Sequence, residues 1–311
     1  LESIGDLTRS MALVPMAFVN WLCAGEFGEI LRWSQTVIDL AAGDPGKGAG
    51  FGLGSPLAIA LAWRGTARWW FGHPEWRQDL RDAVAMAQRS NAETLAGAVA
   101  WTYGFAMQYG VLRATDTIVG VGEEALRVAQ RATSDRAMGL SGYTLAVALL
   151  NRDSAADRDR GLELMMQTRA IWLRKRGLFL IPVTDVWAAR ETARLGDRDA
   201  AIPVMRRAVD QMHTAEDLFY GAWATGVLVE TILSRGTRDD LTEAQAATDR
   251  LFVRWVEDGS AMRAITLLRL RALLARAHGD DVTFRDLATR YLSMAESLGF
   301  EGHTDWARAL V

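Results

Sequence analysis

The chain has 311 residues, of which half are hydrophobic and 23% are charged, and its formal net charge is −3. This weakly acidic balance excludes a protein that binds nucleic acid or anionic lipid over its whole surface, because such binding needs a basic excess. The single cysteine, Cys23, cannot form an internal disulfide, which favours a reducing compartment and a cytoplasmic location. No basic segment precedes the first apolar run and the first residue is Leu1, so we expect a piece excised from a longer protein, without a secretory signal.

The chain opens with a predicted helical hairpin over residues 1–42, whose first helix runs from about residue 7 to 23. Residues 43–55 are predicted to be a glycine-rich linker. Residues 56–311 are predicted to form a helical repeat array that ends in a short C-terminal helix. The array begins at Ser55-Pro56, where a capping hydroxyl precedes a proline suited to the first helical position, and the pair His73-Pro74 predicts the next helix start in the same way.

Turn signals recur along the chain about every 40 residues. The predicted helix-ending turns are marked by Gly25, Gly72, Gly110, Arg152, Gly196, Gly236 and Gly279. Four aromatic residues stand nine positions before four of these turns, namely Trp63, Trp101, Tyr143 and Trp187. Self-similarity at this period is typical of stacked helical hairpins, because each hairpin exposes an apolar face that only its neighbours can cover. The sequence therefore predicts an all-α solenoid of about seven antiparallel helical hairpins.

The turn at Gly196 carries the clearest repeat signature. Ala201 and Ala208 follow it by five and twelve residues, where the tetratricopeptide (TPR) pattern needs small side chains so that helices approach closely. Gly65 stands seven residues before Gly72 and matches the small residue of the first helix in that pattern. The other units fit more loosely, and their intervals exceed a strict 34-residue repeat. We therefore predict a TPR-like array that departs from the TPR consensus.

Several stretches imitate catalytic motifs but lack residues that the chemistry requires. Residues 43–48 resemble a phosphate-binding loop, yet Ala41 stands where the first glycine is needed and Gly48 where a serine or threonine is needed. Residues 139–143 lack the last glycine and the preceding strand of a nucleophile elbow. The four histidines are scattered, without a second ligand at metal-binding spacing. The sequence therefore predicts no catalytic, cofactor-binding or metal-binding residue.

The recurring aromatic residues Trp63, Trp101, Tyr143 and Trp187, here called the aromatic ladder, are the main candidates for a binding site. In a solenoid the first helix of each hairpin lines the concave surface, so the ladder forms either a partner or ligand groove or an inter-repeat core. Packing is the favoured interpretation, because an aromatic ring buries a large area wherever two hairpins meet. Arg64 and Arg68, next to the first of these residues, are candidates for the polar edge of such a groove.

Two further stretches have simple interpretations. Arginines along residues 263–276 and a basic cluster at residues 169–176 are explained by a solvated helix face and by compensation of the helix dipole, so we expect no direct contact with nucleic acid. Nineteen uncharged residues lie between Glu93 and Arg113. They include polar residues and three glycines, which favours a buried solenoid helix over a membrane span.

Short phrases from about residue 50 to the end carry a family resemblance. They are Gly54 to Ala58 with Arg64-Gly65, Gly72 to Arg77, Arg190-Glu191, Gly196 to Pro203, Leu228 to Thr231, Leu268 to Arg276, and Ser297 to His303 with Trp306-Ala307. Together they resemble the C-terminal region of large bacterial signalling proteins, in which a class III adenylate cyclase domain precedes a STAND-type ATPase and a TPR-like array. Related arms occur in transcription regulators that end in a DNA-binding helix-turn-helix.

The resemblance implies a regulatory or sensor arm. Such an arm binds a protein partner or a small effector and controls upstream cyclase and ATPase domains of the same chain. Neither the metal-binding aspartates of a cyclase nor a Walker A loop can be placed on this sequence, so no catalytic residue is carried over. Two alternatives stay open, an oligomerisation scaffold and a helical-array enzyme with an interior pocket.

Overall fold

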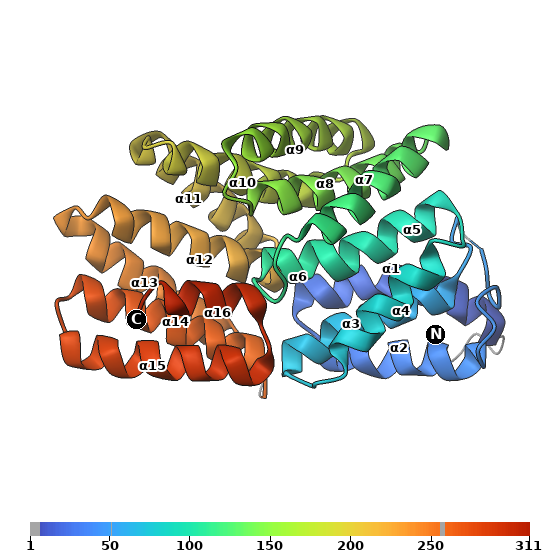
Figure 1. Ribbon diagram of the computed structural model, residues 1–311, viewed down its shortest axis with the longest axis horizontal. Helices are drawn as coiled ribbons and strands as arrows, with labels where there is room; N and C mark the ends of the chain where they lie inside the picture. Colours follow the sequence, from blue (N-terminus) through green and yellow to red (C-terminus); the bar gives the residue numbers. More distant parts are fainter. Residues whose placement is uncertain (1–6, 51, 256–258) are drawn as a thin grey trace. The chain divides into compact units, whose positions relative to one another are not determined.

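The structure, a computed structural model, describes residues 7–50, 52–255 and 259–311, and its regular elements within these ranges are helices (Figure 1). The chain divides into two compact units. Unit 1 comprises the described residues of Leu1–Gln108 and Ala114–Arg176, and unit 2 comprises those of Tyr109–Arg113 and Gly177–Val311. Each unit is a stack of helical hairpins, in which we call the two helices of a hairpin its first and second helix.

Unit 1 contains four hairpins. Their helices are α1 (Leu7–Ala24) with α2 (Phe27–Ala41), α3 (Pro56–Phe71) with α4 (Trp76–Ala87), a continuous helix of α5 (Ala92–Val99), η2 (Ala100–Gly104) and α6 (Phe105–Gln108) with α7 (Asp116–Arg131), and α8 (Asp135–Leu150) with α9 (Ala155–Lys175). The linker between α2 and α3 is formed of turns and one isolated bridge between Gly50 and Leu53. The predicted division of the chain into domains at this linker stays a prediction.

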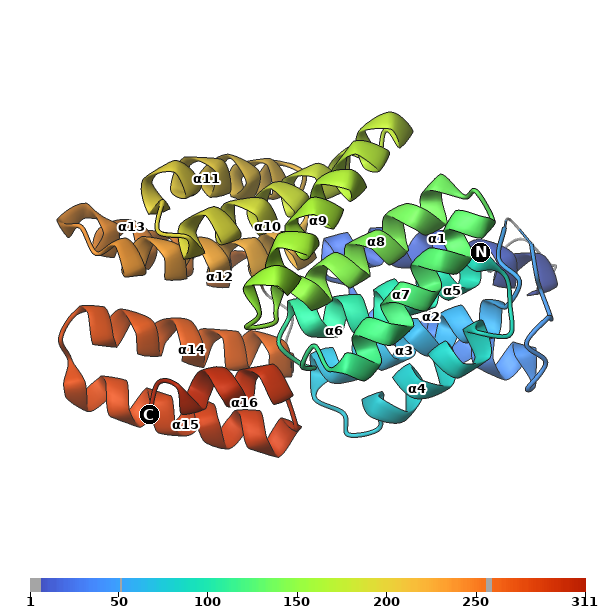
Figure 2. The ribbon, with the colours of Figure 1, turned by 45° about the horizontal axis from the view of Figure 1, so that its top comes forward.

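Unit 2 contains three hairpins and a final short helix (Figure 2). Its elements are η3 (Leu178–Leu180), α10 (Ile181–Arg194) with α11 (Arg198–Thr214), α12 (Leu218–Arg235) with α13 (Arg238–Arg254), α14 (Ala261–Ala277) with α15 (Asp281–Leu298), and α16 (Glu301–Arg308). The seven hairpins confirm the predicted all-α solenoid. Among the described residues, no helix combines the length and the apolar character that crossing a membrane requires.

Local sequence signals set most helix ends. The Ser55 hydroxyl caps α3 by accepting a hydrogen bond from the Ala58 N–H, and Gly72 ends this helix with a φ of 80°, which a glycine adopts without a steric penalty. The prediction that His73-Pro74 begins the next helix is wrong, because α4 begins at Trp76. The His73 N–H donates to the Arg68 carbonyl 2.9 Å away, so His73 belongs to the end of α3.

The long uncharged helix of the third hairpin changes its hydrogen bonding in the middle. Residues 100–104 form a π-helical turn, which leaves main-chain groups displaced from the α-helical pattern. The hydroxyl of Thr66, on α3, donates to the Trp101 carbonyl at 2.6 Å. The neighbouring first helix thus satisfies a carbonyl of the π turn, which fixes the position of Trp101 between two hairpins.

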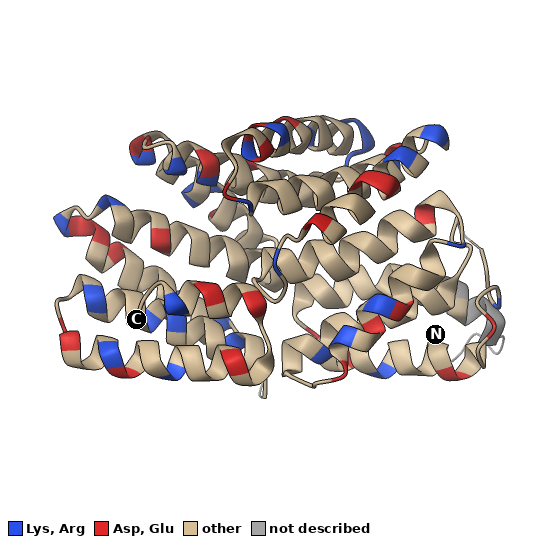
Figure 3. Ribbon diagram, in the orientation of Figure 1, with Lys and Arg blue, Asp and Glu red and all other residues tan. Residues whose placement is uncertain are grey.

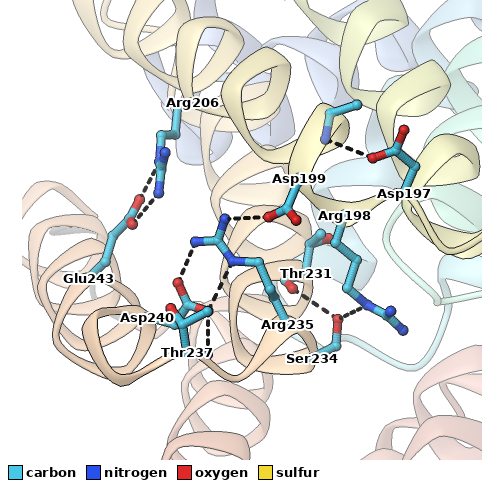
Figure 4. Close-up of polar contacts among 11 residues, drawn as sticks. Asp197, Arg198, Asp199, Arg206, Thr231, Ser234, Arg235, Thr237, Asp240 and Glu243 are labelled. Atoms are coloured by element: carbon cyan, nitrogen blue, oxygen red, sulfur yellow. Dashed lines mark hydrogen bonds and ion pairs between the residues drawn. The ribbon is translucent and has the colours of Figure 1, made fainter.

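An arginine at the end of a first helix links two second helices in unit 2 (Figure 4). Arg235 lies 3.0 Å from Asp199 of α11 and 2.5 Å from Asp240 of α13. Asp240 also accepts a hydrogen bond from the Thr237 N–H at 2.8 Å and so completes the cap of α13. Hydrogen bonding to Arg235 is the main cause that lowers the pKa of the Asp240 carboxyl to about 2.

The same clamp occurs in unit 1 at the same spacing. Arg152 lies 2.6 Å from Asp116 of α7 and 2.8 Å from Asp157 of α9. In both clamps one aspartate stands 36 residues before the arginine and the other stands five residues after it. These arginine clamps therefore hold successive second helices at a fixed stacking distance. Their charge-assisted hydrogen bonds are stronger than those between neutral groups.

Unit 2 includes a five-residue segment, Tyr109–Arg113, that lies between α6 and α7 in the sequence. Its contacts with α16 are hydrogen bonds from the Glu301 N–H to the Val111 carbonyl and from the His303 N–H to the Gly110 carbonyl, both 2.9 Å, and an ion pair between Arg113 and Asp305. A Cβ atom on Gly110 would lie 2.4 Å from the Trp306 ring. The absence of a side chain at Gly110 therefore permits this close approach, which joins residues about 190 positions apart.

Candidate functional site

All four residues of the aromatic ladder are buried. Trp63 on α3 and Trp187 on α10 have no exposed surface, and Trp101 in the π turn and Tyr143 on α8 expose 5% each. The Tyr143 hydroxyl donates a hydrogen bond to the Gln108 side chain. The low exposure of the rings agrees with the packing interpretation of the ladder, and a partner or ligand groove there stays a prediction.

The ladder joins neighbouring first helices through ring contacts. The Trp63 ring centroid lies 5.1 Å from that of Trp101 and 5.3 Å from that of Phe18 on α1. The Trp187 ring centroid lies 4.9 Å from that of Trp223 on α12. Offset and tilted aromatic pairs at these distances contribute about 0.5–1.5 kcal/mol each beyond the area they bury.

Arg64 and Arg68, the predicted polar edge of the groove, both contact one buried carboxylate. Arg64 donates two hydrogen bonds to Asp79 of α4, at 3.0 and 2.6 Å, and a third to Gln35 of α2 at 2.7 Å. Arg68 donates to the same carboxylate at 2.8 Å. Their side chains are 14% and 22% exposed. Both guanidinium groups therefore hold α3 and α4 together, and their contact with a partner stays a prediction.

Arg68 also borders an open cleft of about 610 Å³ in unit 1. The cleft is lined by Gly28, Leu31, Arg32, Gln35, Arg68, His73, Pro74 and Glu75. Arg32 is paired with Glu29 at 2.6 Å, as Arg68 is with Asp79. The arginines of this cleft thus already have carboxylate partners, which weakens its attraction for an anion.

A row of charged side chains crosses the first helices of unit 2. Arg190 comes from α10, Glu230 from α12 and Arg269 from α14, and the row ends at Trp306 of α16. Arg269 lies 2.6 Å from Glu230, with side chains 20% and 29% exposed, and its guanidinium carbon lies 4.2 Å from the centre of the Trp306 ring. The guanidinium carbon of Arg190 lies 5.1 Å from the ring centre of Trp187. We call these residues, Arg190, Glu230, Arg269 and Trp306, the charged row.

The groups of the charged row act on one another electrostatically. Burial lowers the pKa of the Arg190 guanidinium, Glu230 raises it, and Arg194 and Arg269 lower it further. Arginine stays charged in proteins. The pKa directions therefore mean that burial, Arg194 and Arg269 disfavour the charge of Arg190, whereas Glu230 favours it. The row is partly exposed to solvent, and its first helices carry charge where those of unit 1 are mostly uncharged (Figure 3).

Behind Arg269 lies a buried pair of polar rings. The Tyr291 hydroxyl and Nδ1 of His303 are 2.8 Å apart. Burial is the main cause that raises the pKa of Tyr291 and lowers that of His303, and the charge of Arg269 lowers both. His303 is therefore neutral at neutral pH, and neither ring of the pair brings a charge close to Arg269.

The spacing of three residues in the sequence is a signal for the charged row. Arg190, Glu230 and Arg269 are separated by 40 and 39 residues, which is the repeat period itself. The expectation that the arginines of residues 263–276 form a solvated face is wrong for Arg263 and Arg269, which are partly buried, and agrees with the exposure of Arg271 and Arg276. A search for charged residues at the repeat period would have found the row.

A second surface of unit 2 is a mainly apolar groove of about 670 Å³. It is lined by residues of α13, α14, α15 and the turn before α15, among them Phe252, Val253, Leu267, Arg271, Leu274, His278, Asp280 and Leu287. Val253 is 77% exposed at its edge. The described residues contain no group of three or more histidine, cysteine, aspartate or glutamate side chains placed to hold a metal ion.

Comparison with solved structures finds the same architecture in another protein. The chain is similar to a structure described as a Rap protein complexed with competence and sporulation factor, with a TM-score of 0.61 and 14% sequence identity. The similarity covers 99% of this chain and 86% of that chain. No protein-family model matches the sequence, and no curated protein matches it. At this identity the likeness shows the fold alone, and it confirms a TPR-like helical repeat domain.

Proposed function

We propose that the chain is a non-catalytic regulatory module that binds a protein partner or a small effector at the charged row of unit 2. The observation that carries the proposal is the position of Arg190, Glu230 and Arg269 on three consecutive first helices, where they are partly exposed and the two arginines lie over aromatic rings. Charged side chains are costly to hold in a helical core, so a row of them at the repeat period supports a recognition surface.

The fold supports the same class of function. The Rap protein of the similar structure is complexed with competence and sporulation factor, and a helical array of the same architecture is suited to hold a partner in the same general manner. We further propose, from the family resemblance, that binding controls cyclase and ATPase domains upstream in the same chain. Such control requires that the partner or effector bind one state of the parent protein more tightly than the other.

The proposed location is the cytoplasm, where the single cysteine would stay reduced. A cytoplasmic module is also consistent with the regulatory role, since cyclase and ATPase domains use intracellular nucleotides. An oligomerisation scaffold is the second candidate, and the exposed apolar groove along α13, α14 and α15 favours it. Light scattering of the purified chain tests it, because a scaffold must self-associate at micromolar concentration.

The test of the proposed function is a capture experiment from the native cytoplasm followed by direct affinity measurement. The 311-residue chain is compared with Arg269→Gln in the charged row, with the pair Arg64→Ala and Arg68→Ala in unit 1, and with Arg290→Gln as a matched control. Arg290 is 62% exposed and pairs with Asp286 on its own helix. A partner that binds the chain and Arg290→Gln but loses at least tenfold in affinity for Arg269→Gln supports the proposal.

Two results would contradict this assignment. A partner whose affinity falls for the Arg64 and Arg68 variant alone would move the site to unit 1. Synthesis of cyclic AMP or hydrolysis of ATP by the purified chain would replace the regulatory role with the helical-array enzyme.

A further inference from the structure

The mainly apolar groove of unit 2 lies where α13 of one hairpin meets α14 and α15 of the next (Figure 2). Leu274 and Ala275 in its lining are buried, whereas Phe252, Leu267 and Leu287 stay partly exposed. The groove therefore presents apolar side chains that water still reaches. A surface that covers them removes apolar area from water, which favours docking.

The apolar wall at one end of the groove is fixed before any docking occurs. The guanidinium group of Arg263, on α14, donates a hydrogen bond to the Phe252 carbonyl at 3.3 Å. The guanidinium carbon of Arg263 also lies 5.7 Å from the centre of the Phe252 ring. These contacts hold the end of α13 to the start of α14, so docking at the groove has a small ordering cost.

Two opposite charges line the groove without pairing with each other. Asp249 comes from α13 and Arg271 from α14, and both are exposed. Arg271 forms no hydrogen bond or ion pair within the part of the chain that the structure describes. Asp249 accepts one hydrogen bond, from the Gln245 amide of its own helix at 2.9 Å. Asp280 of the same lining differs, because its carboxylate caps α15 by accepting from the Thr283 N–H at 3.0 Å.

Two exposed valines stand beside this hollow. Val253 belongs to the lining and is 77% exposed, and Val282, next to Thr283 of the lining, is 75% exposed. One exposed apolar side chain is ordinary, but here protruding valines, an apolar groove and both signs of charge occur on one surface. Such a surface is self-complementary, because two copies facing each other across a two-fold axis supply each other with all three features.

We propose that the groove along α13, α14 and α15 is the interface of a two-fold symmetric dimer of the chain. Val253 of each copy enters the groove of the other copy. Arg271 of each copy pairs with Asp249 of the other, because every contact of a two-fold interface occurs twice. The inference goes beyond the proposed function, since the groove and the charged row share no residue. Dimerisation and partner binding are therefore separate properties.

Sedimentation equilibrium of the 311-residue chain at micromolar concentration measures the dissociation constant of the dimer. We expect the unchanged chain to dimerise. Val253→Asp should weaken the dimer about tenfold or more, because it places an unpaired charge against an apolar groove. Arg271→Asp and Asp249→Arg should each weaken the dimer about tenfold or more, because each one sets like charges opposite each other.

A mixture of the two charge-reversal variants tests the pairing itself. In a mixed dimer of Arg271→Asp with Asp249→Arg, each of the two contacts again joins an acidic and a basic side chain. The mixture should therefore dimerise with an affinity close to that of the unchanged chain, although each variant alone is monomeric. A groove that receives a different protein cannot give this rescue in a purified mixture.

Two substitutions outside the groove are matched controls. Leu195, at the end of α10, is 81% exposed, so Leu195→Asp repeats the chemistry of Val253→Asp elsewhere on unit 2. Arg207, on α11, is exposed and forms no hydrogen bond or ion pair among the described residues, as is true of Arg271. Arg207→Asp therefore repeats the change of charge. Both controls should dimerise as the unchanged chain does, and thermal melts show whether each variant folds.

The inference is overturned if the chain stays monomeric, if the charge reversals leave the dimer intact, or if their mixture shows no rescue. A captured partner whose affinity falls for Val253→Asp, with a monomeric chain, would assign the groove to another protein and overturn the dimer. None of these results decides the proposed function, which depends on the response of a partner to Arg269→Gln.

Discussion

The first helices α3 of unit 1 and α14 of unit 2 differ in how much of their length they bury. In unit 1, α3 buries 13 of its 16 residues, and its Trp63 packs against rings from α1 and from the π turn. In unit 2, α14 buries only 7 of its 17 residues and carries four arginines, one of which belongs to the charged row. The contrast shows that first helices of one repeat architecture differ widely in how much of their length they bury.

The contrast also separates two roles of tryptophan. Trp63 has no exposed surface and packs against other aromatic rings. Trp306 is partly exposed and lies under the guanidinium group of Arg269. A buried ring stabilises the stack through its area and packing. A partly exposed ring under a cation orients that cation, so the two substitutions should affect different properties.

The largest expected effect is a test of cohesion in unit 1. Trp63→Ala should lower the free energy of unfolding by about 3–5 kcal/mol, because it removes a fully buried ring and leaves a cavity between hairpins. Urea unfolding followed by circular dichroism measures the loss. Trp306→Ala is the matched comparison and should cost less stability while weakening binding of a partner at the charged row. Equal losses of stability in both variants would break the distinction between the units.

The next effect concerns the segment Tyr109–Arg113 in unit 2. A Cβ on Gly302 would lie 2.9 Å from the Gly110 backbone, so Gly302→Ala should destabilise the protein by about 3 kcal/mol, the upper end for overpacking, because main chain cannot move aside easily. Gly120→Ala, on α7, is the control, since nothing lies within 4 Å of its added Cβ and alanine favours the helix. Unfolding midpoints of the two variants measure the difference, and a neutral Gly302→Ala would contradict the close contact.

The arginine clamp of unit 2 has a defined pH window. The pKa of Asp240 falls from 3.8 to about 2 on folding. By linkage, Asp240 contributes about 2 kcal/mol to the free energy of unfolding above pH 4, and this contribution is lost as the pH falls to about 2. Wild type should therefore lose more stability than Asp240→Asn over that window in acid unfolding curves. Parallel curves would show that Asp240 is not held by Arg235. The corresponding Asp157→Asn variant tests the clamp of unit 1.

The smallest effect comes from the buried ring pair behind the charged row. Folding lowers the pKa of His303 well below 6.5. As the pH falls below 6.5, the unfolded chain therefore binds a proton at His303 that the native protein does not bind. Stability should then fall by up to about 1.4 kcal/mol per pH unit from this group, since the unfolded state binds more protons. His303→Asn should show a flatter dependence between pH 6.5 and 5.5 than wild type. An unchanged slope would mean that His303 titrates normally.

Much of the fold could be predicted from local signals. Ser55 capped a helix as expected, and Gly72 ended one, because each signal acts within a few residues. The predicted start of α4 is wrong, because the His73 N–H forms a hydrogen bond with the end of the preceding helix. A single hydrogen bond thus decides to which helix His73 belongs. The contact of Gly110 with α16 could not be predicted, because nothing in a local pattern relates residues so far apart.

The candidate site was less predictable than the fold. The spacing that identified Trp63 and Trp187 indicates a shared position on first helices, but spacing does not tell a buried ring from an exposed one. The charged row depends on which side chains of α10, α12 and α14 face one another, and that follows from the stacking of the hairpins. In both clamps an aspartate stands 36 residues before the arginine, which is Arg152 in one clamp and Arg235 in the other. This recurring spacing can be recognised from the sequence alone.

The affinity of a captured partner for Arg269→Gln tests the central claim most directly. The account predicts that Arg269→Gln loses at least tenfold in affinity, whereas Arg290→Gln binds the partner as the unchanged chain does. Equal affinities of Arg269→Gln and Arg290→Gln would contradict it.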